Sequence, residues 1–134
     1  MENTKHLENL EIAGENFRKW NGLLQTKNPQ RVASLYADEA TFLPTLSGDF
    51  KFGREETTKY FEHFLQKNPF GKIIEEKVQF TDPNHYLHSG LYDFEVDKNG
   101  GGREIIHARF TYLWGLNKKG EWKILHHHSS IKPA

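Results

Sequence analysis

The 134-residue sequence contains no cysteine, which excludes disulfide bonds and thiol chemistry and is compatible with a reducing cytoplasm. It also lacks an excess of charge of either sign, because 18 Lys and Arg residues balance 18 Asp and Glu residues. Nucleic acids and anionic membranes attract basic patches, so neither partner is expected. No apolar run could cross a bilayer, and the first residues do not resemble a secretory leader. We therefore expect a cytoplasmic protein with one domain over residues 1–134.

The first half of the chain is predicted to be mainly helical. Apolar residues at helical spacing indicate a helix over residues 4–27, which ends before Asn28-Pro29. Proline in its first turn favours a second helix over residues 29–36, and another apolar stripe indicates a third over residues 54–67. Short strands are expected at 40–43 and 50–52.

The second half alternates apolar and polar residues, as half-buried strands do. The predicted strands cover residues 72–80, 86–96, 105–116 and 121–130. Helices followed by a run of long antiparallel strands predict an α+β domain, with three N-terminal helices packed on a strongly bent antiparallel sheet.

The last two strands determine which side chains face the core. We expect Trp114 to lie opposite Trp122, which would place Phe110 opposite His126. Even-numbered residues of this hairpin then point inward and odd-numbered ones outward. Phe94 and Tyr92 of the preceding strand are expected opposite Ile106 and Ala108. The core face would then carry four polar side chains: Tyr92, Tyr112, His126 and His128.

An apolar wall with a few convergent polar groups is what a ligand pocket requires. We expect these four residues to line such a pocket, with Trp20 and Tyr60 at its rim. Neighbouring strand residues point to opposite faces, so only His126 and His128 could share a metal ion, and two histidines alone bind weakly. No metal and no cofactor are therefore predicted.

Acid–base catalysis is the alternative use of the same pocket. His126 and His128 could act as bases, with Tyr92 and Tyr112 as proton donors. No carboxylate is predicted to face the core, so a non-catalytic function is preferred.

The outward-facing residues of the sheet mix apolar and polar groups, as subunit contacts do. This pattern predicts a homodimer or larger homo-oligomer. Arg109 could instead form a cross-strand ion pair on a solvated face. The expected contact residues are Leu91, Arg109, Thr111, Leu113, Leu125 and His127.

Two C-terminal stretches carry a family resemblance. They are Ala-Arg-Phe-Thr-Tyr-Leu-Trp at 108–114 and Trp-Lys-Ile-Leu-His-His-His-Ser-Ser at 122–130, followed by Pro133. They resemble the association (hub) domain of calcium/calmodulin-dependent protein kinase II and its free-standing bacterial relatives, within the nuclear transport factor 2-like superfamily. Supporting stretches lie at 36–40, 60–64 and 90–92. The resemblance implies a cone fold that encloses a pocket, and assembly into dimers or rings.

The chain departs from the kinase hub inside that implied pocket. Arginines of the hub fall at the positions of Tyr92, Tyr112 and Ser129, and tyrosine and serine cannot grip a carboxylate bidentately as arginine does. The sequence therefore predicts a non-catalytic, hub-like oligomerisation domain whose cone accepts a small organic ligand. The alternative is a small cone-fold enzyme of the isomerase, cyclase or hydratase type.

Overall fold

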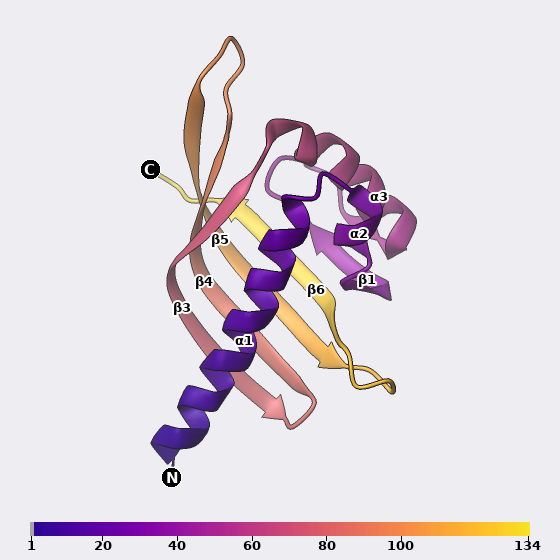
Figure 1. Ribbon diagram of the computed structural model, residues 1–134, viewed down its shortest axis with the longest axis vertical. Helices are drawn as coiled ribbons and strands as arrows, with labels where there is room; N and C mark the ends of the chain where they lie inside the picture. Colours follow the sequence, from indigo (N-terminus) through magenta and orange to yellow (C-terminus); the bar gives the residue numbers. More distant parts are fainter. Residues whose placement is uncertain (1) are drawn as a thin grey trace.

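The computed structural model describes residues 2–134, with side chains from residue 4 onward. It combines helices with a six-stranded sheet, which confirms the α+β prediction (Figure 1). Within these residues no helix has both the length and the apolar character needed to span a membrane. The helices are α1 (Glu2–Leu24), α2 (Pro29–Ala33), α3 (Gly53–Phe64) and a 3-10 turn (Leu65–Lys67). The strands are β1 (Tyr36–Leu43), β2 (Lys51–Phe52), β3 (Phe70–Asp82), β4 (His85–Asp97), β5 (Arg103–Leu116) and β6 (Trp122–Ile131).

The strands form one sheet in the order β2-β1-β6-β5-β4-β3, in which only the β1–β6 pair is parallel. Figure 1 shows the long strands bending around α1, which crosses the concave face. The rings of α1 and α3 pack against this face, so we call the space that they fill the cone interior.

The second helix is shorter than predicted. It ends at Ala33, and Tyr36 already begins β1. The cause is pairing with β6: the Ile124 amide donates to the Leu35 carbonyl at 2.7 Å, and Tyr36 lies beside Ile124 in the parallel ladder. Tertiary pairing thus outweighs the local helical preference of this segment.

The predicted register of the β4–β5 hairpin is confirmed. Phe94 pairs with Ile106, and Tyr92 pairs with Ala108. The even-numbered residues of both strands face the cone interior, and most of them are buried.

The predicted register of the last hairpin is wrong in two respects. Trp122 pairs with Leu116 rather than with Trp114, a shift of two residues that leaves the faces unchanged, and after Ile124 a β-bulge in β6 changes the faces as well. Trp114 pairs with Ile124, but the next residue of β5, Leu113, pairs with His126, so Leu125 is an extra residue. A bulge reverses the alternation of faces for every residue that follows it. Beyond Leu125, the odd-numbered residues of β6 face the cone interior.

The neighbouring strand leaves room for this bulge. A β-carbon on the buried residue Gly115 would lie 2.9 Å from Cδ1 of Leu125, so the leucine side chain fills the space that a side chain at 115 would need.

A second bulge shapes the edge strand β3. Ile73 pairs with Tyr92, whereas Glu75 pairs with the adjacent residue Leu91. Ile74 lies in the bulge and is 52% exposed, although simple alternation would place it on the same face as Val78 and Phe80. At this point β3 approaches β4 closely, and a β-carbon on Gly90 would lie 1.9 Å from the Glu75 carbonyl oxygen.

We expect Gly90→Ala to lower the free energy of unfolding by at least about 2 kcal/mol, because the added methyl group collides with backbone rather than with a flexible side chain. Gly22→Ala is the matched control. Gly22 is exposed in α1 with nothing within 4 Å of the added carbon, so this change should stabilise the protein by about 0.5–1 kcal/mol. Urea unfolding of the two variants measures both effects. Equal stabilities would contradict the close approach of β3 and β4.

Candidate functional site

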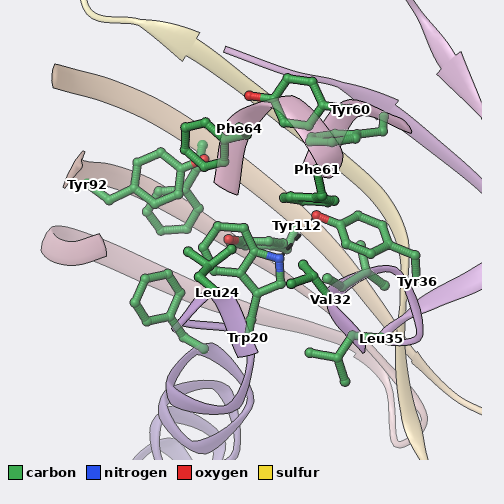
Figure 2. Packing of buried hydrophobic residues seen from close by; sticks show 14 of the residues in the cluster. Trp20, Leu24, Val32, Leu35, Tyr36, Tyr60, Phe61, Phe64, Tyr92 and Tyr112 are labelled. Carbon is green, nitrogen blue, oxygen red and sulfur yellow. Dashed lines mark hydrogen bonds between the residues drawn. The ribbon is translucent and has the colours of Figure 1, made fainter. Parts of the chain in front are cut away.

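Aromatic side chains from α1, α3 and four strands converge in the cone interior. Figure 2 shows the labelled rings turned toward one another rather than around an open space. All of them are at most 8% exposed. The labelled rings are Trp20, Tyr36, Tyr60, Phe61, Phe64, Tyr92 and Tyr112.

His127 lies at the centre of this cluster and is 1% exposed. Its ring is held between two nearly parallel aromatic rings, with centroid distances of 4.1 Å to Tyr112 and 4.8 Å to Phe42. The edge of Trp20 meets it at an interplanar angle of 89°. Such offset and edge-to-face contacts favour one fixed ring orientation.

Both ring nitrogens of His127 form buried hydrogen bonds. Nδ1 lies 2.8 Å from the Tyr36 hydroxyl, and Nε2 lies 3.1 Å from the Tyr92 hydroxyl. Tyr92 donates its own proton to Oγ of Ser129, so it must accept from His127. The neutral ring therefore carries its proton on Nε2 and accepts the Tyr36 proton at Nδ1.

The two ends of this chain of hydrogen bonds are also occupied. Nε1 of Trp20 donates to the Tyr36 hydroxyl at 3.1 Å, and the Ser129 hydroxyl bonds to that of Thr45. We call the connected residues the buried relay. They are Trp20, Tyr36, His127, Tyr92, Ser129 and Thr45.

Burial keeps the relay uncharged. It holds the pKa of His127 well below its ordinary value, and the neighbouring His126 and His128 add to this shift. Burial likewise raises the pKa of Tyr36 and Tyr92 above the usual tyrosine value, and the hydrogen bonds that Tyr36 forms with Trp20 and Tyr92 forms with Ser129 offset this only in part. A desolvated site disfavours the charged form of each group.

The predicted inward positions of His126 and His128 are wrong. Because of the bulge at Leu125, both residues lie on the outer face of the sheet. His126 is half-buried there, with Nδ1 2.7 Å from the Thr41 hydroxyl, and His128 is exposed. Conversely His127, expected at a subunit contact, points into the cone, and Ser129 rather than His126 lies opposite Phe110.

The cone interior has almost no free space. Tyr92, Tyr112, Trp20 and Tyr60 turn into it, but neighbouring rings fill the space between them. Trp20 packs against Tyr112, Tyr92 against Phe94 and Phe110, and Tyr60 against Phe61 and Phe64. The gap beside His127 measures about 10 Å³. One water molecule needs roughly this volume, whereas ligand pockets usually span about 300–1,000 Å³. The ligand pocket expected there is therefore closed.

Sequence reasoning missed a buried histidine with a carboxylate partner. His88 of β4 is fully buried, and its Nε2 lies 2.9 Å from Oε1 of Glu76 on β3. Burial lowers the pKa of His88, although the contact with Glu76 acts in the opposite direction. Nδ1 has no hydrogen-bond partner among the described residues. The sequence could have indicated this position, because His88 and Tyr92 are both even-numbered residues of one strand and therefore face the same side of the sheet.

The outer face of the sheet holds the other expected contact residues. Leu91, Thr111, Leu113 and Leu125 are half-buried, and Arg109 is exposed. The alternative cross-strand ion pair of Arg109 is not formed within the described residues. The Asp93 carboxylate lies 2.7 Å from His107, and Arg109 reaches the Ser130 hydroxyl at 3.3 Å.

Within residues 2–134, no three His, Asp or Glu side chains gather closely enough to hold a metal ion.

Comparison with protein families identifies one match over most of the chain. The family model for the calcium/calmodulin dependent protein kinase II association domain matches residues 10–133. No curated protein matches the sequence.

Solved structures give the same result. A Xanthomonas campestris protein, provisionally described as such an association domain, is 37% identical with a TM-score of 0.88, and the alignment covers 92% of this chain and 86% of that one. A nuclear transport factor 2-like protein from Salmonella enterica is 14% identical, with a TM-score of 0.77 and coverage of 92% and 91%. A provisionally described scytalone dehydratase from Novosphingobium aromaticivorans is 12% identical, with a TM-score of 0.81 and coverage of 99% and 89%. The last two show the fold alone.

The buried relay predicts how stability depends on pH. An unfolded histidine titrates near about 6.5, so below that pH the unfolded chain binds a proton that folded His127 rejects. The free energy of unfolding should be highest above this pH and should fall at lower pH, by up to about 1.4 kcal/mol per pH unit for each such histidine.

We expect His127→Gln to flatten this pH dependence, and His6→Gln, on the exposed start of α1, to leave it unchanged. Urea unfolding at pH 7.5, 6.5 and 5.5, at one fixed protein concentration, provides the measurement. A wild-type free energy that rises on acidification would refute the neutral assignment.

Proposed function

This chain belongs to the calcium/calmodulin dependent protein kinase II association domain family, and on that premise we propose that it is a non-catalytic, hub-like module that forms homodimers or larger homo-oligomers. The proposed contact surface is the outer face of the sheet. The observation that carries the proposal is the set of half-buried leucines on that face, Leu91, Leu113 and Leu125.

The two faces of the sheet differ in what covers them. The inner face receives Trp20 and Phe17 from α1 and Phe61 and Phe64 from α3, and Figure 1 shows α1 on this side. No helix of the described residues contributes its rings to the outer face. A mixed surface of leucine, threonine and arginine is typical of the centre and rim of subunit contacts.

The residues expected to act as catalytic groups in the alternative enzyme hypothesis do not lie together in the structure. Tyr92 and Tyr112 face the cone, whereas His126 and His128 lie on the opposite side of the sheet, so the four groups cannot act on one substrate. His127, which does lie in the cone, has both nitrogens engaged. The structural neighbours named as a dehydratase or as ketosteroid isomerase-like are at most 13% identical and carry only the fold.

Two parts of the sequence prediction stay predictions. One is the cytoplasmic location. The other is a small organic ligand, for which the filled interior leaves no room, although a hollow lies outside the Tyr60–Phe64 pair.

We expect the wild-type protein to have at least twice the mass of one chain by light scattering, and Leu113→Lys to reduce it to a monomer with an unchanged circular dichroism spectrum. The reason is that a lysine in the middle of the contact would be desolvated without a partner. Leu7→Lys is the matched control, because Leu7 is 64% exposed on α1 and should not affect assembly. A strictly monomeric wild type at about 50 μM, well above the Kd of a stable assembly, would refute the proposal.

The outer face also contains a histidine, His126, whose protonation could make assembly depend on pH. His126 lies beside Thr41 on β1 and Leu113 on β5, without a carboxylate partner. Its pKa is lowered by burial and further by His128. An acidic group of this face, Asp93, is engaged by His107. A positive charge on His126 would lie near His128, which disfavours it.

Assembly should therefore be complete above about pH 6.5 and should weaken as the pH falls, because burial in a contact disfavours the protonated ring. We expect the oligomer to dissociate measurably at pH 5.5 and His126→Gln to resist this dissociation. His63→Gln, on the opposite side of the protein, should behave like wild type. Native mass spectrometry at both pH values gives the readout. Equal acid sensitivity of wild type and His126→Gln would contradict this role of His126.

A further inference from the structure

An open hollow of about 460 Å³ lies at the mouth of the cone. It is bounded by the segment that joins β1 to β2 and by the exposed side of α3. Its volume falls within the range of small-molecule sites. We call it the mouth hollow, and its floor is formed by Tyr60 and Phe64.

This floor is flat, apolar and fixed. The rings of Tyr60 and Phe64 stack with centroids 5.6 Å apart and an interplanar angle of 25°. Phe64 also meets Phe94 edge-on, and Tyr60 meets Phe42 edge-on. The backbone of Leu46 bonds to the Tyr60 hydroxyl, which connects the wall of the hollow to its floor. Tyr60 is 8% and Phe64 6% exposed, so a flat ring of a ligand would contact the small part of each ring that reaches the hollow.

The walls of the mouth hollow carry an excess of positive charge. The hollow is lined by three lysines and a histidine, which are Lys51, Lys59, Lys67 and His63. One carboxylate, Asp49, also lines it. With a neutral histidine, three positive charges and one negative charge leave a local excess of two, which falls to one when Glu55, the ion-pair partner of Lys59 at 3.5 Å, is included. The whole chain has a formal net charge of zero, so this excess is a local feature.

Lys51 is the best-placed of these cations. Its side chain is only 20% exposed, and its backbone is held by the pairing of β2 with Phe42 of β1. Its one ion-pair partner among the described residues, Asp49, lies 3.5 Å away and is 79% exposed. A partly desolvated ammonium group with such a weak partner interacts strongly with an added anion.

We propose that the mouth hollow binds a flat organic anion, with its ring on Tyr60 and Phe64 and its negative group beside Lys51 and Lys59. Lysines act as point charges and impose no forked geometry, so a sulfonate, a phosphate or a carboxylate can fill this role. The proposed site goes beyond oligomerisation and is independent of it, because it lies on the helical side of the sheet.

The test uses naphthalene-1-sulfonate as the anionic probe and 1-naphthalenemethanol as its neutral counterpart. The full chain is titrated with each in two-dimensional amide NMR. We expect saturable shifts from the sulfonate confined to residues 45–51 and 59–67, with a dissociation constant that increases with salt. The neutral compound should bind about tenfold more weakly, since it lacks the charge that the lysines attract.

Lys51→Gln/Lys59→Gln should weaken sulfonate binding by about tenfold. The matched control is Lys118→Gln/Lys119→Gln in the β5–β6 loop, which removes the same charge elsewhere and should change binding less than about twofold. Lys59→Gln alone, at a position 64% exposed, gives a second variant that should fold normally and weaken binding.

Three outcomes would overturn the proposal. They are shifts that do not saturate, shifts that map outside the mouth hollow, and an equal loss of affinity in the two double variants. Light scattering on the same samples reports the oligomeric state, so failure of this site is distinguishable from failure of the proposed assembly.

Discussion

The arrangement of this protein depends on one extra residue in its last strand. Leu125 interrupts the ladder between β5 and β6, and from His126 onward every side chain lies on the face opposite to that of a regular strand. The same bulge places His127 and Ser129 in the cone and turns His126 and His128 to the outer face. The absence of a side chain at Gly115 gives Leu125 the space to adopt this position. Both the interior and the proposed contact surface therefore follow from the bulge.

The buried relay explains why the interior is closed. A polar group without water is costly unless it is hydrogen bonded, and here each member from Trp20 to Thr45 has a partner. These partners come from α1, β1, β4, β6 and the segment after β1, so the relay links elements that are distant in the sequence. A ligand entering the cone would have to break several of these bonds and separate stacked rings. The relay is thus better suited to hold one arrangement than to exchange ligands.

Much of the fold could be predicted from local pattern, but the faces of β6 could not. The apolar periodicity of α1, and the register of β4 with β5, rest on strong contrasts between apolar and polar residues. In β6 that contrast disappears at His126-His127-His128, because a shift by one residue still places a histidine on each face. Register is weakly specified where the two faces look alike, so only the tertiary partners Tyr36 and Tyr92 select His127. Glu76 could have been found from alternation alone, because it lies on the same face of β3 as Val78 and Phe80.

The distribution of charge separates the interior from the surfaces available for binding. Burial lowers the pKa of His127 and raises the pKa of Tyr36 and Tyr92, so the cone interior offers no charged group to a partner. The charged residues lie instead on the outer face, around Arg109, and at the mouth hollow, around Lys51. These two surfaces lie on opposite sides of one sheet, joined by the stacked rings of the interior. The proposed assembly and the proposed ligand site therefore use different residues.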